Sequence, residues 1–321
     1  TEIYTLSLHD ALPISFLLIV NNEFDLFPKT QIGNNKHIFF SLYDVSINED
    51  AIYVTDQLGY KIDKFSLDGK LIKSIGRKGR GPGEFITGPA QITINKDTLY
   101  ICDGAGIRYI HLFTKELKYI KSYTIDKSVT DFKSHNNQFY IAANSSVINP
   151  VVSIFNSNFI EESHINLMNK SKNLRANEHH ILVNDKYLFV IYKFRNLIQL
   201  YSLSGKFIRE FSIKGIKKEV RFERKKEIEK TISKKVNPQI AEYYYNWPQG
   251  IICRTVHFYK NDYLVLQSDK YKCLIIDLEG NIKAMFTLKK NSDLMETDKN
   301  NKILISENSF TKLILYELIK K

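Results

Sequence analysis

The sequence has few of the residues on which disulfide-stabilised and zinc-stabilised folds depend. Its 321 residues include three cysteines, Cys102, Cys253 and Cys273, too few and too widely spaced for a disulfide framework or a zinc knuckle. We expect all three to be buried free thiols. Long apolar runs are also missing: SFLLIV at residues 15–20 is far shorter than the roughly 20 residues of a membrane-spanning helix. We therefore expect no membrane span in the visible chain.

The motifs of two enzyme classes are absent as well. The chain has no G-x-S-x-G nucleophile motif and no Gly-Lys-Ser/Thr phosphate loop. These absences argue against a serine hydrolase of the nucleophile-elbow type and against a P-loop nucleotide-binding protein.

The first fourteen residues, TEIYTLSLHDALPI, differ from everything that follows. They match one reading frame of a common sequencing adaptor, and they lack the basic residues and the continuous apolar run of an export signal. We therefore leave residues 1–15 out of the fold as an artefact. We expect the native N-terminus, with any signal peptide or lipidation site, to lie outside the visible sequence.

Positive charge is in excess. The formal net charge is +11, and without Glu2 and Asp10 of the adaptor-like stretch it becomes +13, because 46 basic residues then face 33 acidic ones. Such an excess attracts anionic partners, although abundant Lys, Ile and Asn are also typical of an AT-rich genome.

What the sequence does contain is a repeat of about 40 residues. Residues 42–76 read as a short strand, a polar turn, a strand ending in Asp56, a long alternating strand, an Asp-Gly turn and a fourth strand. The same order returns in further copies, and the sixth copy stops after three strands. The expected copies cover residues 42–76, 90–125, 129–167, 179–213, 250–288 and 292–318.

Four-stranded repeats of this length are typical of β-propeller blades. We predict an all-β fold, a six-bladed β-propeller with four-stranded antiparallel blades, which forms one domain over residues 16–321 and remains a monomer. The missing strand of the last blade should come from residues 16–40, so that the ring closes and no long sheet edge is left open.

One segment, residues 214–249, interrupts the repeat between the fourth and fifth copies. Ile228, Ile232 and Val236 recur every four residues, which predicts a helix that Pro238 would end. Nine basic and four acidic residues lie between Lys217 and Lys235. We therefore expect a basic helical insertion, most simply a solvated strap over the propeller.

The most specific string is GRKGRGPGEFITGPAQITI, residues 76–94. Its alternating glycines, with Phe85 and Pro89 leading into a strand, resemble the NHL-type repeat. Together with the preceding Asp68-Gly69-Lys70 turn, the string is similar to the divergent bacterial six-bladed propeller family. This resemblance implies an extracytoplasmic location, in the periplasm or at the cell surface. We expect the loop to be a tight crossing between blades rather than a phosphate cradle, because no helix follows it.

Propeller topology predicts a binding surface. The connections between blades share one face, so the glycine loop and the basic insertion should make that face positive. The aromatic residues beside the insertion could stack on bases or sugars, or they could dock the insertion onto the domain. The candidate binding residues are Arg77, Lys78, Arg80, Glu84, Lys225, Lys226, Tyr244, Trp247 and Arg254.

The central channel offers a second set of candidates on the inner strands. His180 and His257 are weak candidates for a metal site, since they lack a zinc-binding spacing. The adjacent His179 and His180 point to opposite faces of a strand, so only one can face the channel. We predict no catalytic residue and no cofactor, and leave a divalent metal in the channel open. The polar inner-strand residues are Asp44, Gln91, Asp131, His179, His180, Arg254, His257 and Glu296.

Three functions remain open at this point. The first is a non-enzymatic binding propeller whose positive loop face recognises a protein, a peptide or an acidic glycan. The second is a metal-dependent lyase or lactonase that works in the channel. The third is binding of single-stranded RNA, as in some NHL propellers, which an exported protein would have little occasion to perform.

Overall fold

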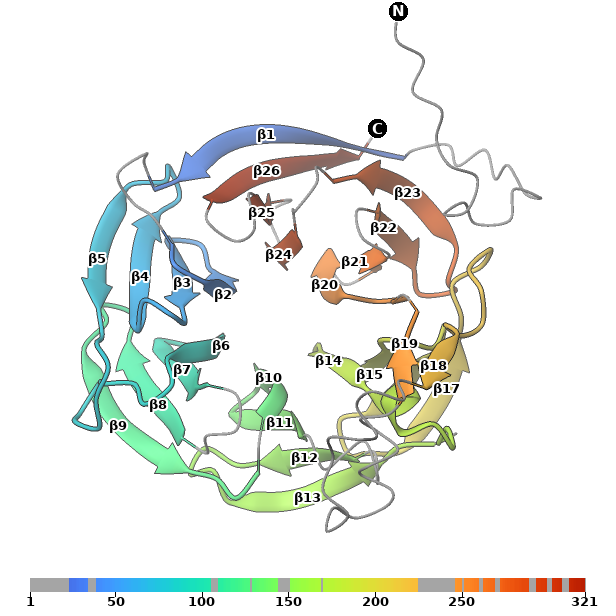
Figure 1. The fold of residues 1–321 in the computed structure, drawn as a ribbon, viewed down its shortest axis with the longest axis horizontal. Coiled ribbons are helices and arrows are strands. Elements are labelled where there is room, and N and C mark those ends of the chain that lie inside the picture. The colour runs from blue at the N-terminus through green and yellow to red at the C-terminus, as the bar shows by residue number, and fades with distance from the viewer. Residues whose placement is uncertain are drawn as a thin grey trace, which may run out of the picture.

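The computed structural model of the chain describes residues 23–33, 39–104, 109–127, 129–143, 151–168, 170–224, 246–249, 251–259, 262–268, 272–288, 293–298, 302–307 and 312–320. Six four-stranded antiparallel sheets stand radially around a central channel (Figure 1). The predicted all-β, six-bladed propeller is thus confirmed. Residues 1–15 lie outside the described residues, so their expected origin stays a prediction.

The first three blades are simple meanders in which the first strand lies nearest the channel (Figure 1). Their tight turns use the chemistry expected from the sequence: Gly69 has a φ of +86°, and a Cβ there would lie 2.3 Å from the carbonyl oxygen of Gln31. The strands are β2 (Leu42–Ile47), β3 (Ala51–Asp56), β4 (Lys61–Ser66), β5 (Leu71–Ile75), β6 (Pro89–Asn95), β7 (Thr98–Asp103), β8 (Tyr109–Thr114), β9 (Tyr119–Thr124), β10 (Val129–His135), β11 (Gln138–Ala143), β12 (Val151–Phe155) and β13 (Glu161–Asn166).

The fourth and fifth blades repeat this order, and the sixth is assembled from both ends of the chain. Its three C-terminal strands are joined on the outside by the N-terminal strand β1. The remaining strands are β14 (His179–Val183), β15 (Tyr187–Tyr192), β16 (Ile198–Ser202), β17 (Phe207–Phe211), β20 (Thr255–Tyr259), β21 (Tyr263–Ser268), β22 (Lys272–Asp277), β23 (Ile282–Thr287), β24 (Asp293–Thr297), β25 (Lys302–Glu307), β26 (Lys312–Lys320) and β1 (Phe24–Ile32).

Strand β1 closes the ring, and it lies within the segment where the closing strand was expected. It pairs antiparallel with β26, from Phe24 opposite Lys320 to Ile32 opposite Leu313. Phe24 is fully buried, and its ring meets those of Tyr259 at 5.4 Å and Tyr263 at 5.5 Å. The closing strand therefore also fastens the sixth blade to the fifth.

Neighbouring blades are held together by apolar side chains packed between their sheets. Leu182 and Phe189 of the fourth blade, for example, share one buried cluster with Val256 and Leu264 of the fifth. Cys102, Cys253 and Cys273 are buried free thiols in such clusters, as expected. The apolar faces that alternate along each strand thus form the core between the blades, and polar residues remain for the channel.

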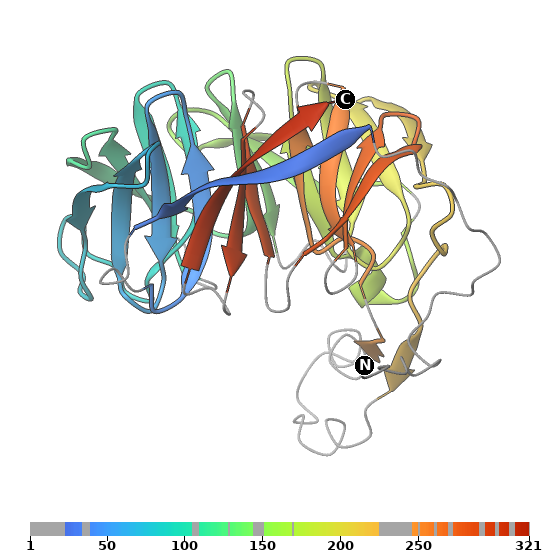
Figure 2. The same cartoon turned by 90° about the horizontal axis from the view of Figure 1, so that it is seen from above.

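The helix expected within residues 214–249 is not supported. The described part of the chain contains no α-helix, and its only helical element is a 3-10 turn, η2 (Leu174–Asn177). The described ends of the insertion instead form a short antiparallel ribbon of β18 (Phe222–Arg224) and β19 (Asn246–Pro248), which projects from one face of the disc (Figure 2). Residues 225–245 lie outside the described residues. The spacing of Ile228, Ile232 and Val236 alone is weak evidence for a helix. The periodicity of a short segment also cannot show that Glu223 pairs with Trp247.

Within the ranges given above, no helix has both the length and the apolar character that crossing a membrane requires.

Candidate functional site in the central channel

The two faces of the propeller carry different loops. Every inner strand begins at the face of the connections between blades and ends at the face of short turns such as residues 48–50 and 184–186. The glycine loop and the insertion are both connections between blades, so they belong to the first face. Gly88, at the end of the glycine loop, packs there against the β3–β4 turn: its φ is +103°, and a Cβ would lie 2.0 Å from the carbonyl oxygen of Gln57.

The glycine loop folds around a carboxylate of its own. The Glu84 carboxylate accepts a hydrogen bond from the backbone N–H of Gly81 (2.8 Å) and one from Nε of Arg77 (2.6 Å). A Cβ at Gly79 would lie 1.9 Å from the same carboxylate. The Gly81 N–H and the Arg77 guanidinium hold the pKa of Glu84 below its ordinary value. The Glu84 carboxylate therefore occupies the place in the loop where an anionic ligand would bind. This agrees with a structural crossing between blades rather than a phosphate-binding loop.

Three of the other predicted binding residues lie on this loop, and most of the rest are not described. Arg77 remains 81% exposed beside Glu84. Lys78 and Arg80 are exposed, and the Lys78 ammonium lies 5.6 Å from the centre of the Tyr60 ring. Three further candidates, Lys225, Lys226 and Tyr244, lie outside the described residues, and only the backbone of Trp247 is described. The positive character of this face stays a prediction.

Most of the polar inner-strand residues join neighbouring blades. Each stands directly before a buried apolar residue of its strand and reaches the next blade. The contacts are Asp44 Oδ2 with Ile92 N–H (3.0 Å), Gln91 Nε2 with Thr130 O (3.2 Å), Asp131 Oδ2 with Ile181 N–H (3.0 Å) and His180 Nε2 with Arg254 O (2.9 Å). Arg254 likewise reaches the sixth blade, where its guanidinium forms a bidentate ion pair with Asp293: Nε lies 2.7 Å from Oδ1 and Nη2 lies 3.0 Å from Oδ2. These residues thus link the blades around the channel and are not free to bind a ligand with the same atoms.

His180 is one of these links, which weakens its candidacy as a metal ligand. Nε2 donates to the carbonyl of Arg254, and Nδ1 lies 3.4 Å from Asp131. Burial lowers the pKa of His180, although Asp131 opposes that shift. His179 points the other way into the blade, where Nδ1 donates to the carbonyl of Asn177 and burial lowers its pKa to about 4. Only one of the two adjacent histidines therefore faces the channel, as expected.

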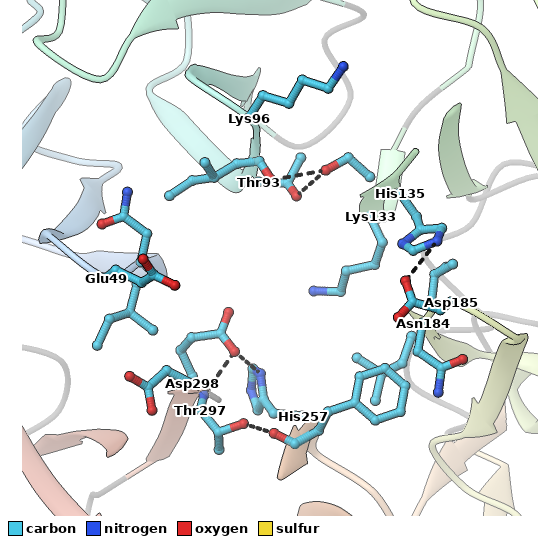
Figure 3. Close-up of a pocket in the computed structure, with 18 of the residues that line it drawn as sticks. Glu49, Thr93, Lys96, Lys133, His135, Asn184, Asp185, His257, Thr297 and Asp298 are labelled. Carbon is cyan, nitrogen blue, oxygen red and sulfur yellow. Dashed lines mark hydrogen bonds and ion pairs between the residues drawn. The ribbon is translucent and has the colours of Figure 1, made fainter. Parts of the chain in front are cut away.

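A cavity of about 680 Å³ occupies the channel on the short-turn face, opposite the glycine loop (Figure 3). All six blades contribute to its wall. Its rim carries charged turn residues such as Glu49, Lys96 and Asp185, and His135 faces Asp185 there at 3.6 Å. Thr93 and Ser134 hydrogen-bond to each other in the wall (2.9 Å). The wall is mixed in charge and about half apolar, and its apolar side chains are Ile47, Ile94, Leu182, Val183 and Phe258.

Three titratable groups, His257, Glu296 and Lys133, lie in the wall of this cavity. His257 on β20 places Nδ1 2.9 Å from Oε1 of Glu296 on β24. Lys133 on β10 points into the middle of the space (Figure 3). Burial alone would raise the pKa of Glu296, but His257 and Lys133 outweigh burial and hold it below its ordinary value.

Lys133 has several carboxylates around it. Its Nζ lies 3.7 Å from Asp131 Oδ1. Burial would lower the pKa of Lys133, but Asp131, Asp44 and Glu296 outweigh burial and raise it to about 12. Burial raises the pKa of Asp44 to about 6, even though Lys133 opposes that shift. The centre of the cavity thus holds a fixed ammonium group beside a histidine–carboxylate pair.

Sequence reasoning listed His257 and Glu296 but missed Lys133. The signal was present, because Asp131, Lys133 and His135 alternate along one strand and so share its channel face.

The two weak metal candidates, His180 and His257, are not part of one cluster. Among the residues for which the structure gives positions, no three His, Cys, Asp or Glu side chains come together in a way that could hold a metal ion. The sequence prediction about cofactors stays a prediction.

The closed ring of six four-stranded sheets places the protein among the six-bladed β-propellers. A family model described as a 6-bladed beta-propeller, DUF5128, matches residues 34–245. The chain belongs to this family. No curated protein matches the sequence, and the more specific resemblance to NHL repeats stays a prediction.

Several solved structures share the fold at very low sequence identity. A protein of Bacteroides fragilis NCTC 9343 that is presumed to be exported has 11% identity and a TM-score of 0.61, over 93% of this chain and 95% of its own. A catalytically inactive virginiamycin B lyase from Staphylococcus aureus, solved with quinupristin, has 15% identity and a TM-score of 0.56, over 92% and 100%. The Pan2 WD40 domain of Neurospora crassa has 6% identity and a TM-score of 0.53, over 91% and 95%. At these identities the likeness shows the fold alone.

Proposed function

We propose that this protein is a binding propeller that takes a polar ligand, such as a segment of a glycan or a peptide, into the channel cavity from the short-turn face. The observation that carries the proposal is the cavity itself: about 680 Å³, walled by all six blades, with Lys133 and the His257–Glu296 pair inside it. A concave site with a few convergent polar groups is the usual form of a ligand pocket. A location outside the cytoplasm is part of the proposal, and the fold it shares with a presumed exported protein supports it.

A cavity-filling substitution tests this proposal. Ser134→Trp places an indole in the cavity wall, and Ser163→Trp on the exposed outer strand β13 is the matched control. Labelled protein is applied to glycan and peptide arrays, after melting curves have shown that both variants are folded. We expect the wild-type protein and Ser163→Trp to bind the same probes and Ser134→Trp to lose them. Binding that survives Ser134→Trp, or the absence of any bound probe, would count against the proposal.

A second candidate is an anionic protein or acidic glycan bound by the positive face. Arg77 is 81% exposed on a loop whose shape Glu84 fixes, and fixed exposed charges speed the capture of an opposite charge. The test is the combined change of five basic residues to Gln, with retention on heparin as the measurement. These residues are Arg77, Lys78, Arg80, Lys225 and Lys226.

The same five-residue variant separates the two candidates. If the positive face is the binding surface, heparin retention and array binding both fall, while the melting temperature stays within about 2 °C of the wild type, because exposed charges add little stability. If the cavity is the site, array binding persists in this variant and is lost in Ser134→Trp.

A further inference from the structure

The His257–Glu296 pair fixes which nitrogen of the imidazole carries the proton. Oε1 of Glu296 accepts from Nδ1 of His257 (2.9 Å) and also from the backbone N–H of Thr297 (2.8 Å). An ionised carboxylate can only accept hydrogen bonds, so the proton of the neutral imidazole is on Nδ1. The lone pair is therefore on Nε2.

This Nε2 has no hydrogen-bond partner among the described residues, and the side chain lines the cavity. The Nε2 atoms of His111 and His179 also lack a hydrogen bond, but both are buried inside the blades, and His111 Nε2 faces the Asp103 carboxylate at 3.7 Å. His180 has both nitrogens engaged. Of the four, His257 alone combines a fixed tautomer with a place in the wall of the cavity, although its side chain is only 9% exposed.

Lys133 supplies the complementary charge. Its side chain is 26% exposed and points into the same cavity (Figure 3). Among the described residues the ammonium forms an ion pair with Asp131 at 3.7 Å, which is longer than an ordinary hydrogen bond, so it can also donate to a molecule in the cavity. A proton acceptor and a fixed positive donor thus face one water-accessible space.

We propose that the cavity is a catalytic site for the hydrolysis of a carboxylic ester, with His257 as general base, Glu296 as its positioning residue and Lys133 as the oxyanion donor. This inference rests on the proposed function, because it takes the ligand of the cavity as the substrate. Nε2 of His257 removes a proton from water as the water oxygen bonds to the carbonyl carbon. The π electrons of the carbonyl move to its oxygen, where the Lys133 ammonium stabilises the negative charge.

The second half of the reaction restores the site. The tetrahedral intermediate collapses, the carbonyl re-forms and the ester C–O bond breaks. The departing alkoxide takes the proton from the His257 imidazolium, which Glu296 has stabilised meanwhile. The products are a carboxylic acid and an alcohol, and water is the only co-reactant.

The first experiment needs no knowledge of the natural substrate. Diethyl pyrocarbonate acylates unprotonated imidazole nitrogens, and peptide mass spectrometry locates the product. We expect His257 to be modified in the intact wild-type protein at least tenfold faster than the sealed His111 and His179. Selective ¹⁵N-histidine NMR should show the Nδ1–H tautomer of His257, and a mixture of tautomers in Glu296→Ala.

The second experiment measures hydrolysis of p-nitrophenyl acetate. We expect saturable release of p-nitrophenol by the wild-type protein. His257→Asn and Lys133→Met should each lower kcat/KM by about 10²-fold, in the range seen for a general base or an oxyanion donor. His164→Asn, on the exposed outer strand β13, should leave the rate unchanged.

The two experiments fail in different ways. If His257 resists diethyl pyrocarbonate, the cavity is closed to small molecules and the proposed function falls together with this inference. If His257 is modified but the ester is not hydrolysed, or is hydrolysed equally by all variants, only the catalytic inference is overturned and the cavity remains a binding site.

Discussion

Asp103 offers a quantitative test of how the blades are held in place. Its carboxylate is fully buried at the end of β7 and accepts the backbone N–H groups of Ile86 (2.7 Å), Thr87 (3.0 Å) and Gly88 (3.1 Å). These three residues are the last part of the glycine loop before β6. One carboxylate thus determines where the chain enters the second blade.

Asp103→Ala removes the acceptor of three backbone donors at once. A buried donor without a partner costs about 1–3 kcal/mol, and water can reach part of this surface after the change. We therefore expect a loss of about 3–5 kcal/mol in the free energy of unfolding. At close to 2 °C per kcal/mol for a domain of this size, the melting temperature should fall by about 6–10 °C.

The assay is urea unfolding followed by tyrosine and tryptophan fluorescence, with Asp97→Ala as the matched control. The Asp97 side chain is 89% exposed and forms a surface ion pair with Lys115, so its removal should change stability by less than about 1 kcal/mol. If Asp103→Ala were as stable as Asp97→Ala, the glycine loop would be held by something other than this carboxylate.

The effect of Asp103 should also depend on pH. Burial would raise its pKa, but His111 and the N–H groups of Ile86 and Thr87 outweigh burial and lower it. A carboxylate with a lowered pKa in the folded state adds stability above its unfolded pKa of about 4, and this stability is lost as the pH falls further. The difference between the wild type and Asp103→Ala should therefore be constant near neutral pH and shrink below about pH 4.

Three further predictions concern the rest of the chain. Removal of residues 1–15 should move the melting temperature by no more than about 2 °C, and a larger fall would mean that these residues pack on the propeller. Phe24→Ala should lower the free energy of unfolding by about 3–5 kcal/mol in urea titrations, and an unchanged value would contradict the role of β1 in closure. Gly88→Ala should cost more than about 2 kcal/mol, because its Cβ would meet the Gln57 carbonyl oxygen at 2.0 Å. Gly83→Ala is the control, because φ is also positive there but the atom nearest to the added Cβ lies at 3.5 Å. An equal loss in the free energy of unfolding at both glycines would show that backbone strain alone is responsible.

The architecture could be predicted from the sequence because it depends on local patterns. Alternating strands and turns such as Asp68-Gly69 recur at a fixed spacing, and a last copy with three strands implies a fourth from elsewhere. The insertion was the exception. Its described ends pair as strands, with Glu223 opposite Trp247, and a contact between residues so far apart leaves no periodic signal.

The candidate site was harder to predict because the same residue types serve two purposes. Asp44 and Asp131 look like channel ligands in the sequence. In the structure, each accepts a hydrogen bond from a backbone N–H of the next blade, about 50 residues further along the chain. Glu84 looks like a loop carboxylate for a partner, yet it fills its own loop. Lys133 resembles the many surface lysines. Contacts between blades in the closed ring decide which polar groups already have hydrogen-bond partners. Spacing along the sequence does not show these contacts.

The pairing of β1 with β26 sets an order of events during synthesis. Among the described strands, β1 is synthesised first and its partner β26 last. Until then, the apolar surface around Phe24 has no Tyr259 or Tyr263 to cover it, whereas the first five blades can each form from neighbouring strands as they emerge. Of the described strands, β1 therefore waits longest for its partner during synthesis, so the sixth blade is the last to close.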